Sequence, residues 1–217
     1  MFELALKSLF AYLIGSLMGA LILGALRGVD IRKLGSGNAG GTNALRTQGK
    51  LFALGVVAID VAKGWFAAAV LPGLALPGDS AGSAPDRVWL AVACATAVTV
   101  GHVYPLWFEF RGGKGAATLI GALLGLAPVF LPPLLLVWLL VVIVTGYVGL
   151  GTMLAVAALP VILAWRAPQQ WALICFALAM VPFIAYTHRG NIARMRAGTE
   201  NRSRRLWLMR PRGAARE

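Results

Sequence analysis

The chain has 217 residues, of which 59% are hydrophobic and only 13% are charged, and its mean hydropathy is +0.77. This composition excludes an ordinary soluble globular domain and indicates an integral membrane protein. The net charge of +12 on so apolar a chain favours an orientation signal and attraction to anionic headgroups over nucleic-acid binding.

The first apolar run, residues 6–26, is too long for a signal-peptide core and lacks a cleavage pattern, so we expect a retained membrane span. Cys94 and Cys175 lie inside later apolar runs, with no CxxC motif and no nearby histidine. We therefore expect both cysteines to be buried apolar side chains, with no disulfide or metal role. The other clear candidate spans are residues 51–71, 87–107, 149–165 and 170–187.

Residues 116–144 are ambiguous, because one helix of this length would rise about 43 Å and exceed a bilayer core of about 30 Å. The Pro132–Pro133 pair interrupts a helix, which favours two short spans joined there. Nine arginines follow His188, and the positive-inside rule places them in the cytoplasm only if this run is split. We therefore predict an all-α membrane protein with seven transmembrane helices, an outside N-terminus and a cytoplasmic C-terminus. Residues 1–205 would form one seven-helix domain, and residues 206–217 a basic cytoplasmic tail.

Three polar segments stand out from the apolar background, and the predicted topology brings all three to the cytoplasmic face. They are "GSGNAGGTNALR" at residues 35–46, "GHVYPLWFEFRGGKGAAT" at residues 101–118 and "HRGNIARMRAGTENR" at residues 188–202. Both histidines of the chain belong to this set. A shared site on one side of the membrane is the structural expectation.

The "RGGKG" turn has the composition of a phosphate site. Glycines let backbone N–H groups approach an anion closely, and a helix starting just behind the turn adds its positive dipole end. It is not a Walker A motif, because Gly115 rather than Ser or Thr follows Lys114. The alternatives are a tight membrane-surface turn here and a flexible loop at residues 35–46.

Two further features have both a structural and a functional interpretation. Asp60 and Lys63 share one helix face within a span, as a structural ion pair or as part of a site. His102 suits a general base, a phosphate ligand or a hydrogen-bonding group at a helix end, and its closeness to "RGGKG" favours a site role. The GxxxG motifs at Gly15–Gly19 and Gly121–Gly125 predict close packing between helices.

Together the three segments resemble the motifs of bacterial membrane glycerol-3-phosphate acyltransferases that use acyl phosphate as donor. Those motifs are GSGNxGATN with a following Arg, GHxxPxxxxFKGGKGxAT, and a terminal His with Asn-Ile-x-Arg and Gly-x-Glu. The departures here are Gly41 for Ala, Arg111 for Lys and Met195 for Leu, and none removes a chemical group that the motifs need. The resemblance covers roughly residues 1–205 and leaves the Arg-rich end outside.

The resemblance implies that acyl phosphate and sn-glycerol 3-phosphate give 1-acyl-glycerol 3-phosphate, a lysophosphatidic acid, and phosphate. It implies the first acylation step of phospholipid biosynthesis, in a multi-pass protein of the bacterial cytoplasmic (inner) membrane with its active site on the cytoplasmic side. No cofactor, metal ion or nucleic acid is expected. The HxxxxD pair of other glycerolipid acyltransferases is missing, since Trp107 and Ala193 stand five residues after the two histidines.

Residues carried over from the motifs, together with Lys63 of the second span, form the expected site. The expected catalytic residues are His102, Lys114, Ser36 and Asn38. The expected substrate- and phosphate-binding residues are Gly35, Gly37, Gly40, Thr42, Asn43, Arg46, Lys63, Arg111, Gly112, Gly113, Gly115, Thr118, His188, Asn191, Arg194 and Glu200. The proton acceptor is either the leaving phosphate or His102.

Two other functions compete with this hypothesis. A transporter of an organic phosphate would place its polar residues near the bilayer midplane, whereas here only Asp60 and Lys63 lie deep. A lipid-binding scaffold needs basic loops but not three sets of Asn, His and Gly. The crowding of these groups in three polar segments therefore favours an enzyme.

Overall fold

The computed structural model describes residues 1–75, 84–203 and 206–209, and in this part of the chain all regular structure is helical. The predicted all-α class is thereby confirmed. The chain divides into two compact units, Met1–Pro128 and Val129–Glu217. Residues 76–83, in a connector without lysine or arginine, and several of the tail arginines lie outside the described residues.

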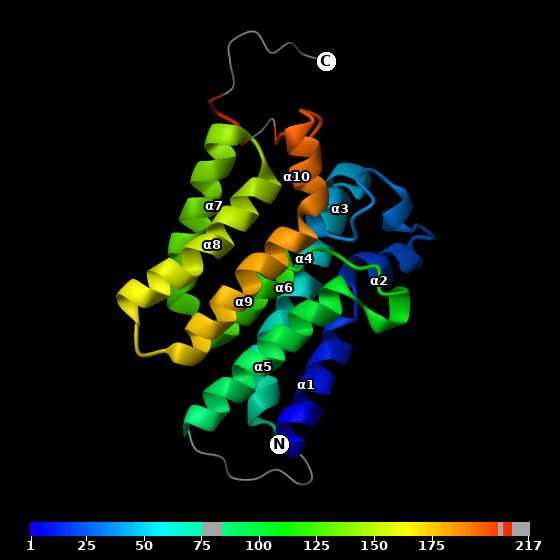
Figure 1. Cartoon of the computed structure of the whole chain (residues 1–217). Coiled ribbons are helices and arrows are strands. Elements are labelled where there is room, and N and C mark those ends of the chain that lie inside the picture. Colours follow the sequence, from blue (N-terminus) through cyan, green and yellow to red (C-terminus); the bar gives the residue numbers. More distant parts are fainter. Residues whose placement is uncertain (76–83, 204–205, 210–217) are drawn as a thin grey trace. The chain divides into compact units, whose positions relative to one another are not determined.

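The first unit packs its long helices in two pairs (Figure 1): α1 lies along α5, and α4 lies along α6, while α2 and α3 cover the beginning of α4. The helices are α1 (Phe2–Gly15), α2 (Gly19–Leu26), η1 (Ile31–Lys33), α3 (Gly41–Gln48), α4 (Lys50–Trp65), η2 (Phe66–Val70), η3 (Leu71–Gly73), α5 (Ala84–Val103), η4 (Leu106–Phe108) and α6 (Ala116–Leu126).

The two GxxxG motifs pack helices together, as predicted. A side chain at Gly15 would meet the backbone of Val98 in α5, and one at Gly121 would meet the backbone of Val61 in α4. Small residues at these contacts let helix backbones approach closely without lipid between them. The Gly15–Gly19 pair also marks the end of α1 and the start of α2, which are bent by 42° from one another. The first predicted span is therefore a broken helix.

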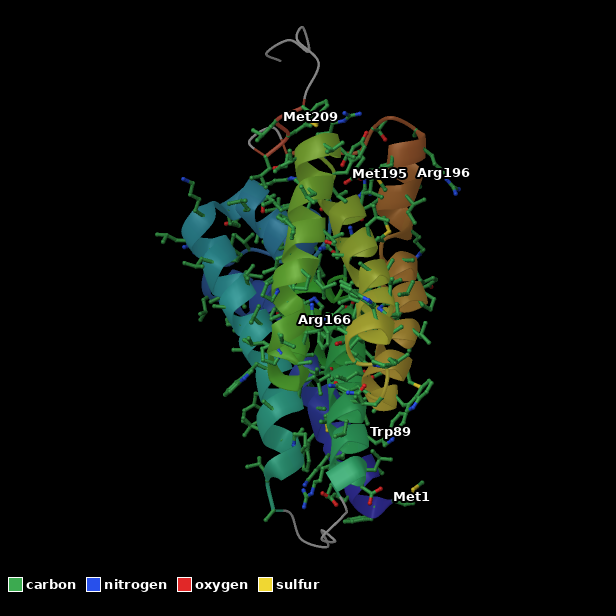
Figure 2. All side chains as sticks on the ribbon, turned by 90° about the vertical axis from the view of Figure 1, so that its left-hand side faces the viewer. Met1, Trp89, Arg166, Met195, Arg196 and Met209 are labelled. Atoms are coloured by element: carbon green, nitrogen blue, oxygen red, sulfur yellow. The ribbon has the colours of Figure 1, made fainter. Side chains whose placement is uncertain are left out.

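The second unit contains η5 (Pro128–Phe130, beginning at the boundary), α7 (Leu131–Thr145), α8 (Val148–Arg166), α9 (Trp171–Thr187) and α10 (Arg189–Arg196). Within it α8 packs between α7 and α9, and the short α10 contacts α8 and α9 (Figure 1). Figure 2 shows this unit with its side chains. Cys175 of α9 is exposed, which corrects the expected burial. A side chain on an apolar span can face lipid as well as protein, and composition alone does not separate the two.

The ambiguous run 116–144 is divided into two helices, as predicted, but the break lies earlier than expected. Helix α6 ends at Leu126, and α7 begins at Leu131 after the single turn of η5. Pro132 and Pro133 therefore occupy the first turn of α7. Proline is tolerated there because the first N–H groups of a helix have no intrahelical partner.

Four helical segments among the described residues are long and apolar enough to cross a membrane, and six are if each bent pair counts as one span. The one predicted span that is not among these six is the fourth in chain order. It corresponds to α6, an apolar helix of 11 residues. It rises only about 16 Å, roughly half of a bilayer core. The structure therefore supports a multi-pass helical membrane protein with four to six candidate spans among the described residues.

Candidate active site

The first polar segment folds around the side chain of Asn43, which is 1% exposed in α3. Its carbonyl oxygen accepts a hydrogen bond from the Ser36 backbone N–H at 2.9 Å. Its amide donates to the carbonyl oxygens of Ile31 at 3.2 Å and Leu34 at 2.9 Å. One buried amide thereby satisfies three backbone groups of the loop, as buried polar groups require. Asn43 sets the shape of the segment.

The other predicted residues of this segment lie around that core. Gly35 has a φ of +56°, and an added Cβ would overlap the side-chain amide oxygen of Asn43. A larger residue would therefore disrupt the loop through both its backbone and its neighbour. The side chains available to a ligand are exposed or half-buried: Ser36, Asn38, Thr42 and Arg46.

The second polar segment folds back over the end of α5. The backbone N–H groups of Gly112 and Gly113 donate to the carbonyl oxygens of Val103 and His102, each at 3.1 Å. These bonds satisfy helix-end acceptors that would otherwise lack partners. A Cβ on Gly113 would overlap Nε2 of His102, so glycine is what allows the turn to lie directly on the histidine ring. Lys114 follows half-buried, and Gly115, with a φ of +87°, leads into α6.

The buried pair Asp60 and Lys63 holds the break between α1 and α2. The Lys63 ammonium lies 2.9 Å from Asp60 Oδ1 and donates to the carbonyl oxygens of Gly15 at 2.9 Å and Leu17 at 2.8 Å. Asp60 Oδ1 also accepts from the Gly19 N–H at 3.4 Å. An ammonium has three donors, and these three oxygens engage them. The geometry favours the structural interpretation of this pair over a phosphate-binding role for Lys63.

His102 lies behind the glycine turn and is 2% exposed. Its Nδ1 atom is 3.4 Å from Asp60 Oδ1 without an aligned hydrogen bond. Asp60 Oδ2 and Thr118 Oγ1 are also buried without a partner among the described residues. Because buried polar atoms are normally satisfied, these atoms are unusual, and His102 connects the "RGGKG" turn to the buried Asp60.

Arg32, three residues before the first polar segment, connects that loop to the second polar segment. Its guanidinium donates to the Asp30 carboxylate at 3.0 Å and to the Phe108 carbonyl oxygen at 3.2 Å. The hydrogen bond from Arg32 lowers the pKa of Asp30 from its ordinary value of 3.8, because it stabilises the charged form. The carboxylate is therefore ionised throughout the neutral range and keeps the guanidinium oriented.

A polar pocket of about 490 Å³ lies where these segments meet. Gly37 comes from the first segment and Arg111 and Gly112 from the second, so the structure brings these two predicted segments together. The remaining lining residues are Asp30, Arg32, Lys33 and Glu109. Three cations and two carboxylates give the wall a net positive charge, which suits an anionic ligand. Ser36, Asn38, Arg46 and Lys114 do not line this pocket.

Sequence reasoning did not single out Arg32 and Lys33, which line this pocket, because their charges already explained the orientation of the first loop. The available signal was Asp30 two residues before Arg32. An aspartate there caps a short helix, and its side chain accepts from the Arg32 backbone N–H. An arginine that is held by a capping aspartate has a fixed orientation. A solvent-exposed arginine that serves only the positive-inside rule does not.

The third polar segment belongs to the second unit and is organised by Glu200. The Glu200 carboxylate accepts from the Asn191 amide at 2.8 Å and from Arg194 Nε at 2.7 Å. His188, 4% exposed, ends α9, with its Nδ1 2.8 Å from the Ile184 carbonyl oxygen. That contact requires a proton on Nδ1 and leaves Nε2 as the acceptor. Glu200 therefore orients Asn191 and Arg194, which are two of the predicted binding residues.

The sequence matches the family model described as glycerol-3-phosphate acyltransferase over residues 5–198. The chain belongs to this family. A glycerol-3-phosphate acyltransferase of Sinorhizobium fredii is 40% identical over 194 residues, covering 89% of each chain. A "glycerol-3-phosphate acyltransferase 2" of Moorella thermoacetica is 42% identical, covering 88% of this chain and 93% of its own.

Crystal structures of PlsY (YgiH), described as an integral membrane glycerol 3-phosphate acyltransferase, are similar to this fold. The glycerol 3-phosphate form has a TM-score of 0.79 and the lysophosphatidic acid form 0.76. Each is 32% identical and covers 92% of this chain and 94% of the other. The acyltransferase family match includes the first two polar segments and most of the third, and it ends before Glu200 and the Arg-rich tail.

Proposed function

We propose that the protein transfers an acyl group from acyl phosphate to sn-glycerol 3-phosphate, giving 1-acyl-glycerol 3-phosphate and phosphate. The observation that carries this proposal is the similarity, over 92% of the chain, to PlsY in a glycerol 3-phosphate form and a lysophosphatidic acid form. These two molecules are an acceptor and an acylated product of this reaction. An enzyme of this kind catalyses the first acylation of phospholipid biosynthesis.

The chemistry fits a site without an enzyme nucleophile. An acyl phosphate is a mixed anhydride, so the glycerol 3-phosphate hydroxyl oxygen can attack the acyl carbon directly. The new C–O ester bond forms while the bond from the acyl carbon to the phosphate oxygen breaks. The task of the protein is then to align the hydroxyl and to offset the charge of both phosphates.

The proton of the attacking hydroxyl goes to the leaving phosphate in this proposal. His102 was the alternative acceptor, but it is 2% exposed and its Nε2 lies against Gly113. A base must come within hydrogen-bond reach of the proton that it removes. A phosphate that gains a negative charge on leaving is both basic and adjacent to the hydroxyl. His102→Gln retaining near-normal turnover at saturating substrate supports this assignment, and a loss of 100-fold or more, roughly the contribution of a general base, refutes it.

Charge neutralisation is assigned to the basic side chains of the first two segments. Two phosphate groups bring about three to four negative charges at neutral pH, and these repel strongly near a low-dielectric membrane. Lys114, Arg46 and Arg111 are the candidate partners, with Ser36, Asn38 and Thr42 supplying neutral hydrogen bonds. In the second unit, His188, Asn191 and Arg194 are proposed to complete the phosphate contacts.

We also propose seven spans with the N-terminus outside and the active site on the cytoplasmic side of the bacterial inner membrane. The support is the concentration of arginine and lysine in the first polar loop, the second polar loop and the tail. The division of residues 116–144 into two helices agrees with the number of crossings that this distribution requires.

Release of inorganic phosphate by purified protein in lipid cubic phase tests the activity. We expect release only when both acyl phosphate and glycerol 3-phosphate are present. Lys114→Ala is expected to lower the rate by 100-fold or more, about 3 kcal/mol of transition-state stabilisation, while the variant still inserts and elutes as a folded protein. Full activity of Lys114→Ala would contradict the assignment. Absence of release combined with uptake of glycerol 3-phosphate into vesicles would instead identify a transporter.

A further inference from the structure

The tail beyond the family match has the composition of a membrane-surface element. The match ends at residue 198, and the chain continues through Arg202 into "RRLWLMRPR" at residues 204–212. Four consecutive apolar residues, Leu206–Met209, are flanked on both sides by arginines. We call these four residues together with Arg202 the tail anchor. None of them belongs to the residues expected to bind substrate or act in catalysis.

The tail anchor is attached to the C-terminal end of α7 within the second unit. The Trp207 indole N–H donates to the Val144 carbonyl oxygen at 3.0 Å, and the Met209 backbone N–H donates to Ile143 at 3.4 Å. Figure 2 labels Met209 at this end of the molecule. Next to Arg202, the Ser203 N–H donates to the Gly146 carbonyl oxygen at 2.7 Å. These bonds satisfy carbonyl groups that the helix end leaves open.

This attachment fixes the depth of the anchor relative to a bilayer. Residues 128–145 form the most apolar of the candidate spans, with a mean hydropathy of 2.5. The end of such a span lies at the boundary between acyl chains and headgroups. Residues bonded to its last turn lie within about 5 Å of that boundary, since a helix rises 1.5 Å per residue. The anchor is thus held at headgroup level.

The side chains of the anchor suit that level. Leu208 is 71% exposed and Met209 66% exposed, so neither apolar side chain is covered by the rest of the described chain. Arg202 lies over the ring of Trp207 at 4.2 Å and over that of Tyr147 at 4.6 Å. Aromatic rings with a polar edge, and arginines with an apolar stem, are characteristic of the membrane interface.

We propose that the tail anchor seats on an anionic phospholipid surface. Leu208 and Met209 insert at the boundary of the headgroups and acyl chains, and Arg202 pairs with lipid phosphates. A nucleic acid or an acidic protein would match the arginines but not the exposed leucine and methionine at the end of a span. Apolar insertion combined with basic charge is the pattern of an interfacial anchor.

The test places an environment-sensitive fluorophore at Leu208→Cys in a Cys94→Ala, Cys175→Ala background of the full chain. In vesicles containing phosphatidylglycerol we expect blue-shifted emission and quenching by nitroxide groups attached near the lipid headgroup. Quenching should be weaker in pure phosphatidylcholine and should fall at about 1 M salt, where charges are screened beyond about 3 Å. Arg202→Gln should lower the docked fraction relative to the undocked one by about fivefold. Gln169→Cys, at the opposite end of α8 from this turn, is the matched label that should not respond to Arg202→Gln.

Three outcomes would overturn the proposal. A fluorophore at residue 208 that stays accessible to an aqueous quencher and is not quenched from the lipid shows that the anchor does not insert. Equal quenching in neutral and anionic vesicles shows that anionic lipid is not what it recognises. A signal that depends on the protein-to-lipid ratio identifies a second copy of the chain as the occupant. An elution profile matching that of the unlabelled parent confirms that each labelled variant is folded.

Discussion

Arg32 illustrates how one side chain can connect two loops that are distant in sequence. Asp30 fixes the guanidinium from one side, and the free end reaches the Phe108 carbonyl oxygen, 76 residues away. Arginine suits this position because its planar fork binds two partners at once. The spacing between Gly37 and Arg111 across the pocket therefore depends on Arg32.

We predict that Arg32→Gln lowers kcat/KM for glycerol 3-phosphate by about tenfold, equivalent to about 1.4 kcal/mol, because the pocket loses its bridge. Arg27→Gln is the control, since it removes the same charge from the same loop. The Arg27 side chain does not form the bridge but stacks on Phe52, 5.0 Å from its ring centroid. Steady-state kinetics on both variants would measure the effect. Equal losses in the two variants would show that only the loop charge matters.

The pH dependence of the bridge follows from Asp30. Arg32 lowers the pKa of this carboxyl below 3.8. The stabilisation of the folded loop by the ionised Asp30 is therefore fully present at pH values above this ordinary pKa. It is lost as the pH falls through the lowered pKa. Asp30→Asn should therefore weaken the bridge at neutral pH and remove this acid-dependent step from the pH profile of KM.

Glu200 has a comparable role in the second unit. We predict that Glu200→Ala lowers the free energy of unfolding by about 2 to 3 kcal/mol, because it removes two hydrogen bonds to an amide and a guanidinium. Hydrogen exchange should increase over residues 191–200. Thr199→Ala, which loses only a 3.4 Å bond from an exposed hydroxyl, is the control and should change little. A Glu200→Ala variant with unchanged exchange would contradict the assigned orienting role.

At the scale of elements, the break between α1 and α2 is built into the site. Lys63 holds the carbonyl oxygens of Gly15 and Leu17 on the two sides of the break. Ser16, between them, accepts a hydrogen bond from the Leu106 N–H of the second polar segment at 3.1 Å. A broken transmembrane helix frees backbone groups, and neighbouring side chains must satisfy them. Here Lys63 and Asp60 of α4 satisfy the backbone of the break, and Ser16 within the break holds the second polar segment.

We predict that Lys63→Met destabilises the protein by about 3 to 5 kcal/mol, the usual effect of leaving a buried charge unpaired, and also lowers kcat of the folded fraction. Lys7→Met is the matched control. Lys7 is also buried, and it bonds Glu3 at 2.8 Å and the Pro72 carbonyl oxygen at 3.1 Å, but at the other end of α1. It should destabilise without changing kcat. Thermal unfolding in detergent and turnover per folded molecule separate the two effects, and equal kcat for both variants would refute the coupling.

At the scale of the whole molecule, the number of crossings determines where each loop lies. Seven spans place the turn between α8 and α9 outside, whereas six would place it in the cytoplasm. The two schemes agree on all loops before residue 116, so only the loops after that residue distinguish them. A single cysteine on each side is therefore sufficient to decide.

We predict that Gln169→Cys, in a background without Cys94 and Cys175, reacts with a membrane-impermeant thiol reagent in intact cells. Ala197→Cys should react only after permeabilisation, because the arginine-rich tail is expected inside. Ser80→Cys, in the second connector between α4 and α5, is the positive control, since both topologies place it outside. The reverse pattern at residues 169 and 197 would support six spans.

The membrane class, the helical content, the division of residues 116–144 and the three polar segments were predictable from the sequence. Each depends on composition, on charge or on local spacing, which act over a few neighbouring residues. The exposed position of Cys175, the engagement of the Lys63 ammonium and the bridge formed by Arg32 were decided only by the tertiary structure. These contacts join atoms 46 to 76 residues apart or depend on which side of an apolar helix faces protein. Residue type alone contains neither kind of information.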